Sequence, residues 1–131
     1  GNFIPRNELL KLADKLLEMG KNFILDESFV DFSTNAEQES MITQEILDKY
    51  PNLLIIKSIS KSYGVPGIRL GVLTTSNKDI MSAIEKEVTI WNINSFGEFF
   101  LQVFGKYKKD YKVASQKIAK ERDRFYKRLQ G

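Results

Sequence analysis

The sequence contains no cysteine and no histidine. The absence of cysteine excludes disulfides and thiolate metal sites, and it is compatible with a cytoplasmic location. The absence of histidine removes the commonest metal-binding imidazole and the usual general base at neutral pH. We therefore predict no metal site, and any proton transfer must fall to lysine, a carboxylate, tyrosine or water.

Long apolar runs are also absent. No stretch approaches the roughly 20 apolar residues that a membrane-spanning helix needs. The N-terminus, which reads GNF, shows no recognisable signal peptide. Because no apolar run is long enough to span a membrane, we expect no membrane partner.

The 131 residues fit one modest domain.

The net charge of +3 is unevenly distributed. Residues 106–128 contain ten Lys or Arg and three Asp or Glu. A basic helix of this kind can bind nucleic acid, but few aromatic residues lie on its basic face. A solvated helix face is the commoner explanation, so we predict no nucleic-acid partner.

Hydrophobic periodicity predicts an α/β architecture, with the order helix, strand, helix, strand, strand and then helices. Ser76 and Ser95 are the predicted N-caps of two helices, and Gly105 is a predicted helix end. We expect a largely parallel sheet that binds ligands beyond the carboxyl ends of its strands. The predicted strands are 22–25, 53–57 and 70–74; the predicted helices are about 5–19, 43–49, 76–88, 95–105 and 106–129; and residues 31–42 are a predicted loop.

A lysine stands in a short turn between two apolar strands. Residues 58–71 read SISKSYGVPGIRLG, so that Ser58 and Ser60 come just before Lys61 and Arg69 follows it by eight residues. A fixed amine beside groups that can bind phosphate suggests pyridoxal phosphate, held through a Schiff base on the lysine. An ordinary strand–loop–strand segment is the competing explanation.

The pattern S-x-S-K-x-x-G-x-x-G-x-R-x-G in residues 58–71 resembles the active-site lysine signature of the class I/II, fold-type I aminotransferases. The resemblance implies a three-layer α/β large domain and the cofactor pyridoxal 5'-phosphate. It also implies a small-molecule amino-acid substrate and a homodimer in the full-length protein. Within the family, the chain is similar to the branches of histidinol-phosphate aminotransferase and threonine-phosphate decarboxylase.

The resemblance makes Lys61 the catalytic residue. A free lysine amine has a pKa of about 10.4 and is mostly protonated at neutral pH. Burial and a nearby cation such as Arg69 would lower that pKa and favour bond formation with the cofactor. Asp26 follows an apolar strand and resembles the aspartate of the family's Asp-x-x-Tyr. Its carboxylate would pair with the protonated pyridine nitrogen and keep the ring an electron sink.

Four further positions are implied cofactor contacts. Ser58 and Arg69 match the family's phosphate ligands, and Ser60 is common in the branch that resembles histidinol-phosphate aminotransferases. Arg69 could make a bidentate contact with phosphate. Phe29 departs from the family, which usually has a tyrosine there to hydrogen-bond the cofactor's phenolic oxygen. The threonine-phosphate decarboxylase branch resembles this chain in having phenylalanine.

Gly1 resembles the last glycine of the family's N-P-x-N-P-x-G motif. We therefore expect residues 1–131 to be part of the cofactor-binding large domain, without its N-terminal part and without the C-terminal small domain. The residues that orient the substrate would then lie outside this stretch. The chain alone is accordingly expected to be inactive.

Three functions follow from the resemblance. The first is a biosynthetic aminotransferase. The first alternative is a decarboxylase of a phosphorylated amino acid, which Phe29 favours. The second alternative is an aminotransferase-like sensor domain of a transcription regulator, although no helix-turn-helix segment is visible in the sequence.

Overall fold

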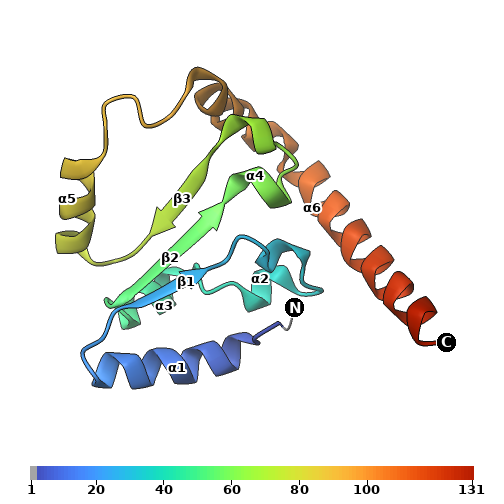
Figure 1. The fold of residues 1–131 in the computed structure, drawn as a ribbon, viewed down its shortest axis with the longest axis horizontal. Helices are drawn as coiled ribbons and strands as arrows, with labels where there is room; N and C mark the ends of the chain where they lie inside the picture. The colour runs from blue at the N-terminus through green and yellow to red at the C-terminus, as the bar shows by residue number, and fades with distance from the viewer. Residues whose placement is uncertain (1–2) are drawn as a thin grey trace.

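The computed structural model describes residues 3–131, so the predicted role of Gly1 lies outside the described residues. A three-stranded sheet in the order β1-β2-β3 forms the centre (Figure 1). Its strands are β1 (Phe23–Asp26), β2 (Leu53–Ser58) and β3 (Gly71–Thr74). β1 pairs with β2 in parallel, and β3 pairs with β2 antiparallel.

The α/β prediction is confirmed, but the sheet is mixed, with one pairing of each sense, where the sequence predicted a largely parallel one. The reason lies in the connection from β2 to β3. It contains only the short helices α4 (Ile59–Ser62) and η2 (Pro66–Ile68). Ile59 N donates to Leu70 O at 3.0 Å and closes this connection into a loop. The chain therefore turns back beside β2, because a parallel return usually needs a full crossover helix.

One face of the sheet carries the hydrophobic core. The helices α1 (Arg6–Glu18) and α3 (Gln44–Lys49) pack against it, and Figure 1 shows α1 running alongside the strands. Because strand side chains alternate between faces, Asp26 projects to the face opposite this core. The buried core residues are Leu9, Ala13, Phe23, Met41, Ile46, Leu47, Tyr50, Leu53 and Ile55.

The predicted polar loop at 31–42 is more ordered than its sequence suggested. It contains the 3₁₀ turn η1 (Val30–Phe32) and the single-turn helix α2 (Ala36–Glu39). Met41 is fully buried there. Its backbone N–H donates to Glu27, a buried carboxylate that also accepts from the Ser40 hydroxyl at 2.7 Å. This carboxylate ties the segment back to the end of β1.

The two predicted serine caps are both displaced by one residue. The N-cap of α5 (Lys78–Glu87) is Asn77, whose side chain accepts from Ile80 N at 3.0 Å. The N-cap of α6 (Ser95–Gln130) is Asn94, whose side chain accepts from Gly97 N at 2.9 Å. Asparagine and serine are nearly equal as N-caps, so the sequence alone could not choose between neighbours.

The predicted break at Gly105 is wrong, because α6 runs through it as a single helix of 36 residues. A glycine inside a helix costs only about 1 kcal/mol relative to alanine. The Tyr63 ring compensates by packing on Phe104, at 4.8 Å between ring centroids, and on Tyr111, at 4.3 Å. Contacts on both sides of the glycine hold the two halves of α6 in line.

Within residues 3–131, no helix combines the length and apolarity that crossing a membrane requires.

Candidate active site

The carboxyl ends of β1 and β2 lie side by side. The parallel register pairs Asp26 with Ile56, two residues before Ser58. The chain then enters α4, which carries Lys61. The sequence expectation that Asp26 and the lysine turn meet at one edge of the sheet is therefore met by the geometry (Figure 1).

A buried serine joins these two strand ends. Ser28, only 4% exposed, donates its backbone N–H to Asp26 Oδ1 at 2.8 Å and its hydroxyl to the same oxygen. The Ser28 hydroxyl also accepts a hydrogen bond from Ser58 N at 2.9 Å. Ser28 was not among the residues predicted from the sequence. Its signal was present, because an aspartate two residues before a serine favours an Asx turn.

The Asp26 carboxyl is held in its ionised form. The Ser28 hydroxyl is the main cause of its lowered pKa, followed by the Ser28 N–H, and the positive charge of Lys61 adds a smaller contribution. Burial opposes these effects without cancelling them. At neutral pH the group is therefore a carboxylate, the form that can pair with a protonated ring nitrogen.

Lys61 is exposed and lies next to Phe29. Its Nζ is 4.6 Å from the centroid of the Phe29 ring, a cation–π distance. Phe29 is itself 61% exposed, so both side chains are open on one side. The structure thus places Phe29 beside the catalytic candidate, where the sequence placed it only by resemblance.

Arg69 is exposed and has an unusual backbone. It is the only non-glycine residue with positive φ among residues 3–131, at 51°. That left-handed conformation costs about 1–2 kcal/mol for an L-residue. Its guanidinium donates one hydrogen bond, from Nη1 to Pro66 O at 3.3 Å. A strained, charged residue in an open loop is typical of a functional position.

The predicted serine ligands differ in accessibility. Ser58 is half-buried at the end of β2, whereas Ser60 is only 5% exposed within α4. Ser60 is therefore the one predicted phosphate ligand that is buried. The side chains of Lys61 and Arg69 remain accessible on either side of it.

An ion pair and an aromatic stack lie on either side of the lysine turn in the sequence. Lys57 Nζ lies 2.7 Å from Asp31 Oδ1, and both side chains are largely buried. Tyr63, two residues after Lys61, stacks on Tyr111 of α6 with an interplanar angle of 7°. The ion pair joins η1 to β2, and the stacking joins the residue after α4 to α6. Neither member of the ion pair was predicted from the sequence.

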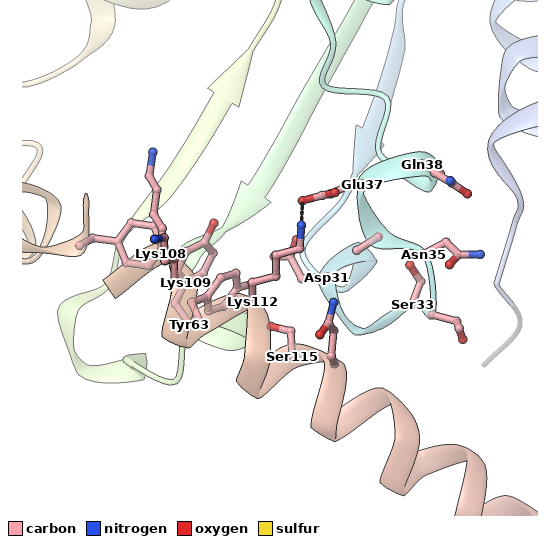
Figure 2. A pocket seen from close by; sticks show the side chains of 15 residues that line it. Asp31, Ser33, Asn35, Glu37, Gln38, Tyr63, Lys108, Lys109, Lys112 and Ser115 are labelled. Carbon is pink, nitrogen blue, oxygen red and sulfur yellow. Dashed lines mark hydrogen bonds and ion pairs between the residues drawn. The ribbon is translucent and has the colours of Figure 1, made fainter. Parts of the chain in front are cut away.

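A cavity of about 580 Å³ lies away from this site. It lies between α6 and residues 31–38, where Lys112 pairs with Glu37 at 2.8 Å (Figure 2). None of the six predicted site residues lines it. No cluster of three or more acidic residues that could hold a metal occurs among residues 3–131. The chemistry of the strand ends, rather than cavity size, therefore defines the candidate site.

Comparison with known proteins agrees with this geometry. Residues 1–131 match the family Aminotransferase class I and II, and the chain belongs to that family. The L-serine phosphate decarboxylase of Sulfurospirillum multivorans is 35% identical over 127 residues, which cover 95% of this chain and 32% of that protein.

Two solved structures share the fold. The histidinol-phosphate aminotransferase from Clostridium acetobutylicum has a TM-score of 0.85 and 31% identity, covering 99% of this chain and 38% of that one. A decarboxylase from Sulfurospirillum multivorans has a TM-score of 0.81 and 34% identity, covering 100% of this chain and 34% of that one. The chain therefore spans little more than a third of the length of these relatives.

Proteins of this family depend on pyridoxal 5'-phosphate, and the residues present here fit that group. Asp26 Oδ1 is occupied by Ser28, whereas Oδ2 accepts no hydrogen bond within residues 3–131 and is free for a ring N–H. Lys61 supplies an accessible amine 4.6 Å from an aromatic ring. Arg69 supplies an accessible guanidinium. Acid, amine and cation are the three chemical functions that a pyridoxal phosphate site requires.

We expect Arg69→Ala to weaken the affinity for pyridoxal 5'-phosphate by roughly ten- to a hundredfold. Losing a hydrogen bond to a charged group costs on the order of 1.5–3 kcal/mol. Equilibrium titration of the cofactor-free full-length protein measures the change. Arg69→Lys keeps the charge without the planar fork and should lie between the two.

The control ligand for this prediction is pyridoxal, which lacks the phosphate. Its affinity should be the same in the parent and in Arg69→Ala. If both ligands weakened equally, Arg69 would act on the fold of the loop and not on the phosphate.

Proposed function

We propose that the protein containing this chain is a pyridoxal-phosphate-dependent decarboxylase of a phosphorylated amino acid, and that residues 1–131 form part of its cofactor-binding large domain. The observation that carries the choice of reaction is the 35% identity to an L-serine phosphate decarboxylase across 95% of the chain. The position of Phe29 against Lys61 supports the same branch. The fold does not decide, since an aminotransferase and a decarboxylase match it with TM-scores of 0.85 and 0.81.

When bound, pyridoxal phosphate withdraws electrons from a bond at the substrate's α-carbon. Asp26 would hold the proton on the ring nitrogen, which keeps that withdrawal strong. Lys61 would hold the cofactor until substrate replaces it, and its side chain, as an ammonium, would then deliver a proton to the α-carbon that carbon dioxide has left. Arg69 and Ser58 would hold the phosphate end of the cofactor.

Phe29 lacks a group that could donate to the cofactor's phenolic oxygen. It instead presents its ring face to the Lys61 ammonium. A ring face stabilises the charged amine and imposes no hydrogen-bond direction on it. In our proposal, the lack of a fixed hydrogen-bond direction leaves the Lys61 side chain free to reach the α-carbon after decarboxylation.

Aminotransferase activity is the second candidate, supported by the fold match to a histidinol-phosphate aminotransferase. Both reactions use the same visible residues, so the products must distinguish them. Decarboxylation releases carbon dioxide and leaves a phosphorylated amine. Transamination consumes an oxo acid and leaves a phosphorylated oxo compound or aldehyde.

The test is an assay of the full-length protein with pyridoxal 5'-phosphate. We expect carbon dioxide release from L-serine phosphate or L-threonine phosphate without any added oxo acid. Unphosphorylated serine and threonine are the matched controls and should react far more slowly. Amino-group transfer from histidinol phosphate to 2-oxoglutarate, with no carbon dioxide release from either amino acid, would favour the aminotransferase.

The partner prediction is a homodimer of the full-length protein. Residues before and within the first turns of α6 expose large apolar side chains, which a second subunit or the rest of the same chain would cover. The most exposed of these apolar residues are Ile90, Trp91, Phe96 and Phe99.

A cytoplasmic location remains our prediction.

A further inference from the structure

We propose that Ser28 is a positioning residue, which aims the Asp26 carboxylate at the cofactor ring and fixes it to the start of the lysine turn. The inference rests on the proposed cofactor site and assigns a role to a residue outside the family's signature. Ser28 is 4% exposed, and its hydroxyl lies between Asp26 and Ser58, which hold the ring nitrogen and the phosphate in our proposal. It is not expected to contact cofactor or substrate.

The geometry divides the two oxygens of Asp26. Oδ1 accepts both hydrogen bonds from Ser28, and Oδ2 accepts none from the described part of the chain. A carboxylate held at one oxygen by two donors from the same residue cannot rotate freely. The free oxygen is thereby presented in one direction, as a ring N–H requires for a short charge-assisted hydrogen bond.

The Ser28 hydroxyl also links the two strand ends. It donates its proton to Asp26 Oδ1 and accepts from Ser58 N at 2.9 Å. One hydroxyl therefore connects the residue proposed to hold the ring with a residue proposed to hold the phosphate. Ser28→Ala breaks both links together, while the Ser28 backbone N–H still reaches Asp26.

The Ser28 hydroxyl is also the largest cause of the lowered pKa of Asp26, so it favours the ionised form that a ring N–H requires. Removing the hydroxyl leaves the backbone N–H and the Lys61 charge to favour the ionised form. Asp26 would stay ionised at neutral pH, but its free oxygen would no longer be held in one direction. That loss of direction weakens the contact with the ring N–H, so cofactor affinity should report it.

A purely structural role for Ser28 predicts something different. Loss of the hydroxyl leaves Ser58 N–H without a partner, which would destabilise the loop whatever side chain stands at position 26. A double-mutant cycle separates the two roles. If Ser28 acts through Asp26, its substitution matters only while the Asp26 carboxylate is present.

The experiment titrates the cofactor-free full-length protein with pyridoxal 5'-phosphate and follows bound cofactor by absorbance. The variants are Ser28→Ala, Asp26→Ala and the double variant. We expect Ser28→Ala to weaken binding about tenfold in the parent and by less than about twofold beside Asp26→Ala. If Ser28→Ala does not fold, Ser28→Cys, which has a weak donor of similar size, takes its place in the cycle.

Ser40→Ala is the matched control, because it removes a serine hydroxyl from the neighbouring carboxylate Glu27. It should leave cofactor affinity within about twofold of the parent. Equal losses from Ser28→Ala in both backgrounds, or no loss in either, would overturn the positioning role. A parent protein that binds no pyridoxal 5'-phosphate would instead refute the proposed function, so the two failures are distinguishable.

Discussion

Replacing Lys61 with alanine in the full-length protein is expected to abolish covalent retention of pyridoxal 5'-phosphate. It should also lower kcat by at least about 10²–10⁴-fold, the usual contribution of a positioned acid–base group. The physical reason is that, in our proposal, Lys61 supplies both the amine that holds the cofactor and the proton returned to the substrate. No other lysine lies in the motif of residues 58–71.

The measurement has two parts: dialysis of the protein against cofactor-free buffer and a steady-state assay. Lys78→Ala is the matched control, since Lys78 is an exposed lysine in the first turn of α5. It should retain cofactor and activity. Retention of cofactor by Lys61→Ala at the parent's level would show that Lys61 does not hold it.

The second large effect is expected from Asp26→Asn. The amide has nearly the same shape but no negative charge, so the ring nitrogen loses the partner that keeps it protonated. We expect kcat to fall roughly a hundredfold, which corresponds to losing about 3 kcal/mol of charge-assisted stabilisation. Cofactor affinity should fall less than kcat, by roughly ten- to thirtyfold, because in our proposal Arg69, Ser58 and Lys61 still hold the remainder of the group.

The pH dependence of this effect follows from the sign of the pKa shift. Asp26 has a folded pKa below its ordinary value of 3.8. Its carboxylate therefore stabilises the fold fully above that ordinary value, and the stabilisation is lost as the pH falls through the lower folded pKa. At neutral pH the carboxylate is fully ionised. The ratio of parent to Asp26→Asn kcat should thus be constant between about pH 6 and pH 8.

A kcat ratio that changed across this range would mean that another group titrates in place of Asp26. Equal losses of affinity and of kcat in Asp26→Asn would mean that the residue binds the cofactor without tuning it. Parallel measurement of both quantities on one preparation distinguishes these results.

The strands and the lysine motif could be predicted because each depends on local sequence. Apolar runs end at Asp26 and at Ser58, and the structure ends β1 and β2 at those residues. The antiparallel sense of β3 was missed, although the predicted strands 53–57 and 70–74 leave too few residues between them for the crossover helix of a parallel return. The hydrogen bond from Ile59 N to Leu70 O, which closes this loop, could not be predicted from local sequence.

The site shows the same division. Asp26, Lys61 and Arg69 were named from their chemistry together with the resemblance to the aminotransferase signature, and the structure places them at or near the same strand ends. The turn between Asp26 and Ser28 is local, but the contact of Ser28 with Ser58 spans 30 residues, and no local pattern encodes it. The burial of Ser60 and the approach of Phe29 to Lys61 likewise depend on tertiary packing.

Borohydride reduction of the full-length protein loaded with pyridoxal 5'-phosphate tests the central claim most directly. Reduction makes the bond between cofactor and lysine permanent, and peptide mapping by mass spectrometry then locates it. Our account predicts a single labelled peptide, with the cofactor on Lys61, and no label at that position in Lys61→Ala. A label on a different lysine of the parent, or none at all, would contradict it.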